Sequence, residues 1–592
     1  MTYAWDAILN HVARQISEAA DVVVGPSDLT TPPNPELGDL AFGCFAVAKA
    51  QKKSPAIIAT ELVKRLNAIK KDHLIESANA AGPYVNVTLH GGEVISRVVK
   101  DVENDGDAYG TVDVGEQKTL MLEYAQPNTH KEVHVGHLRN LLLGASLAKI
   151  LKRNNWNVIT ASYHGDVGAH VAKCLWLFVK KSASGFSPNL DLATAKKILA
   201  AVPKEDRTGK YLGQLYTEAS KFLDENPDIK LEISIVQQRL EANDPAWNVL
   251  WQETRRWSIE EIKRIFEDLG VTIDRQYFES EVMDEGQRMV DDLIAKKVAH
   301  ESQGAIIVDL EEKKLGVFLV RKSDGTSLYS TKDLALAWKK VKEYPALDRS
   351  LLLVDNRQSL YFKQLFEVLR MMGYSQSQEF VGHEFVTLQS GAMSSREGNI
   401  VRFEAFRDDV VGYAREETIH RHENWPEGRV SHTAWCLAMG GVKYGMLKQD
   451  SDKLYTFVLE RALAFDGDTG PYIQYAATRL ASILKKTDWN PKKGMKIGDP
   501  VILGEPTERR LAIHIAQFPS AVRRSGEELK PSVIAQWCFG MAHRVNDFYR
   551  DVPVMEATND ELRATRLRLV ASALTTLTLG LDLLGIPLPE EM

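Results

Sequence analysis

Residues 118–163 constrain the fold of this chain more than any other stretch. They contain an apolar run, TLMLEY, then a segment with apolar residues at helical spacing, LRNLLLGASLAKILKR, and then a second apolar run, VITASY. Apolar strands that alternate with helices of this length are typical of a parallel sheet of the doubly wound type. In such sheets, ligands bind outside the carboxyl ends of the strands. The sequence therefore predicts a Rossmann-type α/β domain with a site where the first strand ends.

The junction between this strand and the helix carries two histidines, His134 and His137, with Gly136 between them and Lys131 just upstream. Residues three positions apart lie on one face of a helix. Gly136 leaves room for a flat base against the backbone, and the free amide groups at the start of a helix favour phosphate. The junction indicates a nucleotide site, although a structural histidine pair remains open for these residues alone.

The longer fragment LEYAQPNTHKEVHVGHLRN resembles the HIGH motif of class I aminoacyl-tRNA synthetases, and its acidic residue, PN, K and HVGHLRN resemble the arginyl-tRNA synthetases specifically. The resemblance implies ATP-dependent activation of L-arginine to arginyl-adenylate and transfer to the 3′ end of tRNA(Arg), giving AMP and pyrophosphate. It implies that Lys131, His134 and His137 are catalytic and that ATP binds with Mg²⁺. We expect no tightly bound metal, because no dedicated protein cage is visible.

A second fragment, LQSGAMSSREGNIV, resembles the mobile KMSKS loop of the same enzymes. Ala392 and Ser395 stand at its two lysine positions. Lysine loss of this kind is found among arginyl-tRNA synthetases, where a lysine just upstream of HIGH is thought to substitute, and Lys131 stands there. The resemblance implies that Arg396 is catalytic too. It implies ATP contacts from His134, Gly136, His137, Met393, Ser394, Ser395 and Arg396.

A guanidinium that leaves water needs carboxylates and a hydroxyl or amide in its plane, because its donors pair bidentately and its charge must be neutralised. Carboxylate, hydroxyl and amide side chains of this kind follow several expected strands. They resemble the residues that bind the arginine side chain in the family. The implied L-arginine site consists of Glu123, Asn128, His137, Tyr329, Asp333 and Gln358. Structural alternatives stay open: Asp333 as an acid at a helix start, Tyr329 as a core aromatic, and Glu123 as the partner of some arginine. Ala125 and Gln126 depart from the small hydroxyl residues that are common before PN.

At 592 residues the chain is long enough for about three or four domains. We expect residues 1–110 to form a small mixed α/β domain that opens with an amphipathic helix. GDLA and GPYVN resemble the N-terminal domain of arginyl-tRNA synthetases, which contacts the outer corner of tRNA. Turn glycines of any small domain explain these two fragments as well.

Residues 111–410 form the expected catalytic domain, which a charged, helical insertion interrupts at about 185–260. After it, strand and helix alternation resumes with GAIIVDL, GVFLVRK, LLLVD and EFVGHEFVTL. From 411 to 592 the strands stop, and helical spacing predicts an all-helical domain that resembles the anticodon-binding domain of the family. Its arginines, with Trp537, Phe548 and Tyr549, fit the stacking of single-stranded bases, although each aromatic alone fits a core position.

Bulk properties exclude several classes of protein. The net charge of -7 argues against coating nucleic acid by bulk electrostatics. The 4 cysteines are far apart, so neither a disulfide framework nor a four-cysteine zinc site is indicated. No apolar run approaches the roughly 20 residues that span a bilayer, and the N-terminus does not resemble a signal peptide. We expect a cytoplasmic monomer without membrane contact.

Two other classes of protein remain open at this stage. One is a different class I enzyme, such as another synthetase or a small-molecule adenylyl or cytidylyl transferase. The zinc cysteines expected of cysteinyl-tRNA synthetases are missing, and a small-molecule transferase would not need the large helical C-terminal region. The other is a catalytically silent, synthetase-like RNA-binding protein, which the loss of both KMSKS lysines favours. The intact Lys131, His134 and His137 argue against silence.

Overall fold

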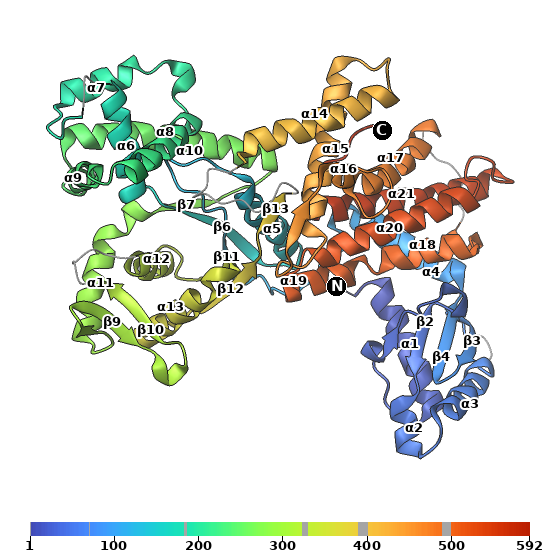
Figure 1. Ribbon diagram of the computed structural model, residues 1–592. Helices are drawn as coiled ribbons and strands as arrows, with labels where there is room; N and C mark the ends of the chain where they lie inside the picture. Colours follow the sequence, from blue (N-terminus) through green and yellow to red (C-terminus); the bar gives the residue numbers. More distant parts are fainter. Residues whose placement is uncertain (1, 70–71, 183–185, 323–328, 389–400, 488–498) are drawn as a thin grey trace. The chain divides into compact units, whose positions relative to one another are not determined.

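The computed structural model describes residues 2–69, 72–182, 186–322, 329–388, 401–487 and 499–592. It divides into two compact units (Figure 1). One unit comprises Met1–Val114, Ala414–Tyr444 and Arg461–Met592, and the other comprises Gly115–Tyr413 and Gly445–Glu460. All expected site residues that the structure describes belong to the second unit.

A five-stranded parallel sheet organises the second unit, with strand order β12-β11-β5-β6-β7 (Figure 1). The strands are β5 (Thr119–Glu123), β6 (Asn157–His164), β7 (Arg275–Phe278), β11 (Arg349–Asp355) and β12 (Ser377–His383). The chain leaves the central strand β5 toward β6 and later returns to its other side at β11. This reversal of strand order is the place where such sheets bind ligands, and β5 is the strand that the sequence predicted.

Helices accompany this sheet. α5 (Val135–Arg153) joins β5 to β6, and α6 (Ala169–Ser182) follows β6. The later helices of this part are α11 (Met283–Ala295), α12 (Tyr329–Glu343) and α13 (Ser359–Met371). Short 3-10 turns lie at η5 (Glu279–Glu281), η6 (Glu311–Lys313) and η7 (Asn356–Gln358). The predicted doubly wound arrangement is therefore present.

Two of the runs expected to resume this alternation form a different sheet. β8 (His300–Ser302), β9 (Ala305–Asp309) and β10 (Val317–Arg321) make a separate antiparallel sheet of order β10-β9-β8. In β9, Ile306 and Val308 are buried, and the neighbours that alternate with them are more exposed. This one-sided burial is typical of an antiparallel sheet, so the expectation that these runs extend the alternating pattern is wrong.

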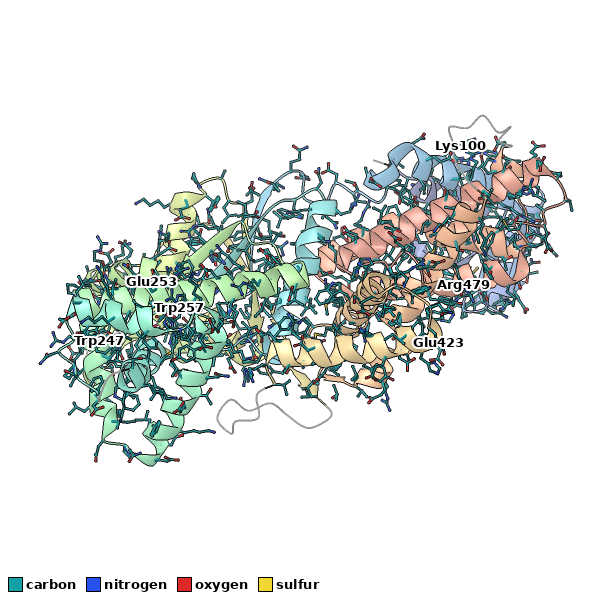
Figure 2. All side chains as sticks on the ribbon, turned by 90° about the horizontal axis from the view of Figure 1, so that it is seen from above. Lys100, Trp247, Glu253, Trp257, Glu423 and Arg479 are labelled. Carbon is teal, nitrogen blue, oxygen red and sulfur yellow. The ribbon has the colours of Figure 1, made fainter. Side chains whose placement is uncertain are left out.

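The charged insertion is helical, as predicted. It contains α7 (Leu192–Ala201), the short η4 (Lys204–Asp206), α8 (Gly209–Glu225), α9 (Ile229–Glu241) and α10 (Pro245–Leu269). Trp176 of α6 and Trp247 of α10 are completely buried in its core. Figure 2 shows Trp247 and Trp257 on α10 together with Glu253.

The N-terminal part of the other unit is a small antiparallel sheet with helices. Its elements are α1 (Ala4–Ala20), η1 (Pro26–Asp28), β1 (Leu29–Thr30), η2 (Pro35–Leu37), β2 (Leu40–Gly43), α2 (Phe45–Gln51), α3 (Pro55–Asn67), β3 (Ile75–Ala81), β4 (Tyr84–Leu89), α4 (Gly91–Asp105) and η3 (Gly106–Ala108). The strand order is β1-β2-β4-β3. This is the expected mixed α/β arrangement, opened by the predicted amphipathic helix.

The C-terminal part of the chain, which contributes to both units, is mainly helical. Its elements are α14 (Phe403–Arg421), α15 (Glu427–Leu447), α16 (Leu459–Ala462), α17 (Gly470–Lys486), η8 (Pro500–Ile502), α18 (Pro506–Ala516), α19 (Phe518–Glu528), α20 (Ser532–Asp551) and α21 (Asp560–Leu583). One short strand, β14 (Tyr455–Phe457), pairs with β13 (Val386–Leu388), so the expectation that strands stop at 410 is wrong at this point.

The aromatic residues singled out in this region divide between core and surface. Trp537 and Phe548 are buried, which favours their core interpretation, whereas Tyr549 is 49% exposed. The guanidinium of Arg479 lies 4.9 Å from the ring centroid of Tyr549. Within the described ranges, every helix is too short or too polar to cross a membrane.

Candidate active site

The helix that follows β5 begins with a reciprocal pair of histidine caps. His134 is the N-cap of α5, and its Nδ1 accepts the backbone N–H of Gly136 at 3.1 Å. Nδ1 of His137 in turn accepts the backbone N–H of His134 at 3.1 Å. The caps satisfy amide groups that a helix start otherwise leaves unpaired. The side chains are thus fixed at the carboxyl end of β5, where the sequence placed them.

These two hydrogen bonds determine which ring nitrogen carries the proton. An Nδ1 atom that accepts a hydrogen bond has no proton, so a neutral ring carries its proton on Nε2. Burial lowers the pKa of His134 to about 4 and that of His137 to about 3, and the nearby charge of Lys131 adds to both effects. Near pH 7 both rings are therefore neutral and present one N–H donor each at Nε2.

Lys131 is held by the inserted helical subdomain. Its Nζ lies 4.9 Å from the ring centroid of Tyr216 on α8, a cation–π distance. One turn earlier on α8, Gly213 packs against Glu132, and a Cβ at Gly213 would lie 2.2 Å from Cγ of Glu132. The insertion thus supports the segment that carries the expected catalytic lysine.

The segment after the second motif pairs with the start of α5. The N–H of Val135 donates to the carbonyl of Val401 at 3.1 Å, and the N–H of Phe403 donates to that of Val133 at 3.0 Å. This places the described C-terminal end of the motif beside the histidine caps. Four of the expected ATP-contacting residues lie outside the described residues: Met393, Ser394, Ser395 and Arg396.

Glu123 ends β5 inside a buried ion pair. Its Oε2 accepts a hydrogen bond from Nζ of Lys340 on α12, and the two side chains are 3% and 4% exposed. Oε1 accepts the side-chain N–H of Gln126 at 3.0 Å. The structural alternative for Glu123, an ion pair with an arginine, is thus partly correct, because Glu123 forms an ion pair but with a lysine.

Asp333 is the fifth residue of α12, just past its first turn, and the charges of two other carboxylates influence its pKa. Burial raises the pKa of Asp333 to about 7, and the negative charges of Glu123 and Glu279 add to the effect. The hydroxyl of Tyr361 donates to Asp333 and lowers the pKa, as does the charge of Lys340. We call Glu123, Glu279 and Asp333 the carboxylate cluster.

The charges of this cluster are incompletely matched. Glu123 pairs with Lys340, and Glu279 pairs with Lys332 at 2.6 Å. Among the described residues, no cation lies within ion-pair distance of Asp333, whose partner is the neutral hydroxyl of Tyr361. Buried carboxylates are usually paired. The cluster therefore has the electrostatic character of a site that accepts one further cation.

The remaining expected substrate residues come from three segments of the same unit. Oδ1 of Asn128 accepts the N–H of Gly165 at 3.1 Å, and a Cβ at Gly165 would lie 2.6 Å from that oxygen. Tyr329 begins α12 and is 66% exposed, so it is not a core aromatic. Gln358 is exposed on the turn after β11, the strand next to β5.

Asn140 ties the turn after β5 to the neighbouring strand. Its Oδ1 accepts the N–H of Ala125 at 2.8 Å, and its Nδ2 donates to the carbonyl of Leu353 at 3.1 Å. Ala125 has φ of 62°, a left-handed conformation that alanine rarely adopts. The clamp by Asn140 accounts for this conformation and orients the segment that leads to Asn128.

Sequence reasoning missed Glu279 of the carboxylate cluster. It also missed four residues that pair with the cluster or whose pKa the cluster influences: Tyr163, Lys332, Lys340 and Tyr361. Lys340 follows Asp333 by seven positions on one helix, which puts both on the same face and was a usable signal. Glu279 comes directly after β7, at a strand end, but no motif marked that strand.

Comparison with known proteins gives matches along almost the whole chain. Residues 98–459 match the family model of the class I tRNA synthetase (R) catalytic domain. Residues 6–89 match the arginyl tRNA synthetase N terminal domain, and residues 473–592 match the DALR anticodon binding domain. The expected resemblance of all three regions is confirmed.

Curated relatives and solved structures agree with these family models. The chain is 36% identical over 577 residues to an arginine–tRNA ligase of Bdellovibrio bacteriovorus, which covers 95% of this chain and 94% of the relative. It is 32% identical to that of Treponema denticola, over 99% of both chains. The arginyl-tRNA synthetase structure of Thermus thermophilus matches with 25% identity and a TM-score of 0.72, over 98% of this chain and 99% of that one.

The family models match in all three regions, and the relatives align over nearly their whole length. These matches agree with the histidine-capped helix that follows β5. The chain therefore belongs to the arginyl-tRNA synthetases, a family of class I aminoacyl-tRNA synthetases.

Proposed function

We propose that this chain is an arginine–tRNA ligase that activates L-arginine with ATP and transfers the arginyl group to the 3′ end of tRNA(Arg). Pyrophosphate leaves in the first step, and AMP leaves in the second. The observation that carries the proposal is Asp333, a half-buried carboxyl that hydrogen-bonds the hydroxyl of Tyr361, has no cationic partner among the described residues and has its pKa raised by the charges of Glu123 and Glu279. A guanidinium supplies the missing charge.

At the nucleotide end, the Nε2–H donors of His134 and His137 are assigned to the phosphates of ATP. Their Nδ1 atoms are occupied by the helix caps, so the donors are oriented before the substrate arrives. The substrate carboxylate attacks the α-phosphorus, and negative charge develops on the phosphate oxygens. Preorganised donors stabilise such charge without reorganisation. Mg²⁺ arrives with the nucleotide as part of the substrate complex.

Lys131 is assigned as the cation for the same phosphates. It stands next to the histidines in sequence, and Tyr216 holds its ammonium group through the ring face. Gly136 leaves space at the helix start for the nucleotide. Met393, Ser394, Ser395 and Arg396 are proposed to close over ATP from the second motif, with Arg396 as a further catalytic cation.

At the arginine end, Asp333 and Glu123 are assigned to the guanidinium. Tyr329 and Gln358 are assigned to its remaining donors, and Asn128 and His137 to the amino and carboxylate groups. Asn128 retains free capacity for this role, because an amide side chain has more hydrogen-bonding sites than the one that Gly165 uses. We place the enzyme in the cytoplasm, without membrane contact, and propose that it acts as a monomer.

The proposal is tested by arginine-dependent exchange of pyrophosphate into ATP, measured with and without tRNA(Arg). Exchange is expected with arginine and not with the other amino acids, and the family resemblance implies that it needs the tRNA. A catalytically silent RNA-binding protein would bind the tRNA and give no exchange under any condition. That outcome overturns the proposal.

A further inference from the structure

Tyr163 carries a buried hydroxyl near the carboxyl end of β6. The residue is the penultimate one of β6, and its ring packs against the core beside the parallel sheet. Its hydroxyl oxygen is shielded from solvent and has no hydrogen-bond partner among the described residues. Buried hydroxyl groups are almost always paired, because leaving one unpaired costs stability. An unpaired one at a strand end of this sheet points to a ligand.

Tyr163 lies on the face of the sheet that carries Glu123, because Glu123 pairs with Ala161 and Tyr163 is two residues further along β6. Burial raises the pKa of Tyr163, and the charges of Asp333, Glu279 and Glu123 add to the effect. Each of these carboxylates already has a partner: Tyr361 for Asp333, Lys332 for Glu279 and Lys340 for Glu123. None of these hydrogen bonds uses the Tyr163 hydroxyl, which stays without a partner among the described residues.

We propose that the Tyr163 hydroxyl is a specificity-determining contact that accepts a hydrogen bond from the guanidinium of bound L-arginine. A guanidinium has five N–H donors and no acceptor, so two carboxylates cannot satisfy it alone. A tyrosine hydroxyl that accepts one of these donors can still donate its own proton to a cluster carboxylate. The inference rests on the proposed function, because it assumes that the carboxylate cluster holds the side chain of arginine.

Tyr277 offers a matched control. It stands directly opposite Tyr163 on β7 in the sheet register, so both side chains project from the same face. Its hydroxyl already donates to Oε2 of Glu343 at 3.0 Å. Tyr163→Phe therefore removes an oxygen without a protein partner, and Tyr277→Phe removes one with a partner.

The test compares the wild type, Tyr163→Phe and Tyr277→Phe by tRNA-dependent pyrophosphate exchange and by thermal unfolding. For Tyr163→Phe we expect KM for arginine to rise about 10- to 100-fold, the usual effect of one lost contact to a charged group. KM for ATP should stay the same, and the melting temperature should be equal or higher. Tyr277→Phe should lower the melting temperature and leave KM for arginine unchanged.

The outcomes separate this inference from the proposed function. If the wild type shows no arginine-dependent exchange, the proposed function fails. If the wild type is arginine-dependent but Tyr163→Phe has the wild-type KM for arginine, only this inference is overturned. A lower melting temperature of Tyr163→Phe with an unchanged KM would assign the hydroxyl a structural role and would also overturn it.

Discussion

The backbone N–H of His134 donates to Nδ1 of His137 at 3.1 Å, and the centroids of the two imidazole rings are 3.9 Å apart. This hydrogen bond combines a structural task with the chemical one that we propose for the ring. The nitrogen that faces the backbone completes the helix cap, and the other nitrogen keeps a proton to donate. Histidine serves both tasks because its two ring nitrogens are distinct in the neutral form.

The double role of His134 can be separated by substitution. In His134→Asn the amide oxygen can still accept the N–H of Gly136, since asparagine is a preferred N-cap residue, but the donor at the Nε2 position is lost. We expect the activation rate to fall by roughly 10²–10³, the cost of one lost transition-state donor, with little change in the melting temperature.

His134→Ala removes the cap as well and should cost about 1 kcal/mol of stability in addition. Pre-steady-state activation assays and thermal unfolding measure the two effects. A full rate in His134→Asn would show that the Nε2 donor is not used.

Lys131→Ala should lower the rate of arginine activation by roughly 10²–10³, because a cation aimed at the phosphates is lost. The loss in Arg396→Ala should be smaller. Lys173, whose Nζ lies 5.3 Å from the centroid of the same Tyr216 ring, provides a control of equal charge change. Lys173→Ala should leave the activation rate near the wild-type value in the same assay. Equal and trivial losses in Lys131→Ala and Arg396→Ala would contradict the assignment.

The pKa of about 7 for Asp333 predicts how arginine binding depends on pH. A cation binds the ionised carboxylate, so below pH 7 binding requires loss of a proton, and KM for arginine should rise up to about tenfold per pH unit. Above pH 7 it should be flat. His134 and His137 do not contribute to this change, because their pKa values of about 4 and about 3 keep both neutral.

The measurement is KM for arginine between pH 5.5 and 8.5, with KM for ATP as an internal reference. Asp333→Asn should raise KM for arginine and remove its pH dependence. The same pH profile in Asp333→Asn and in the wild type would exclude Asp333 as the titrating group.

Lys340→Met should destabilise the protein strongly, because it leaves the carboxylate of Glu123 buried without its partner. Breaking a buried pair from one side costs about 3–5 kcal/mol. In the double variant Glu123→Gln/Lys340→Met most of this loss should be recovered, while KM for arginine stays high because the carboxylate is gone. Chemical denaturation gives the stabilities, and pyrophosphate exchange gives KM. If the loss of stability in the double variant equals the sum of the losses in Glu123→Gln and Lys340→Met, the two residues do not form a pair.

Patterns within short stretches of sequence predicted the elements whose formation depends on neighbouring residues. The strand before His134 and the helix after it were readable, because an apolar run and a cap signal meet within a few residues. The β9–β10 hairpin was misassigned, since short apolar runs do not reveal whether their partners are parallel or antiparallel. Residues 305–308 are all apolar, and the alternation in this strand exists only in the burial of its side chains.

The candidate site was predictable only where a motif marks it. Lys340 lies 217 positions from Glu123 in the sequence, and no local pattern shows that two such residues meet. The unpaired state of the Tyr163 hydroxyl is likewise a property of tertiary packing. The residues at Met393 to Arg396 were assigned by resemblance, and their assignment stays a prediction.

If the carboxylate cluster selects a planar cation, citrulline provides the most direct test. Citrulline has nearly the shape of arginine but no charge, so a cluster that needs a cation leaves its carboxylates unmatched when citrulline binds. In tRNA-dependent pyrophosphate exchange at saturating ATP, we expect kcat/KM for arginine to exceed that for citrulline by about 10⁴ or more. Comparable values for the two amino acids would contradict the account.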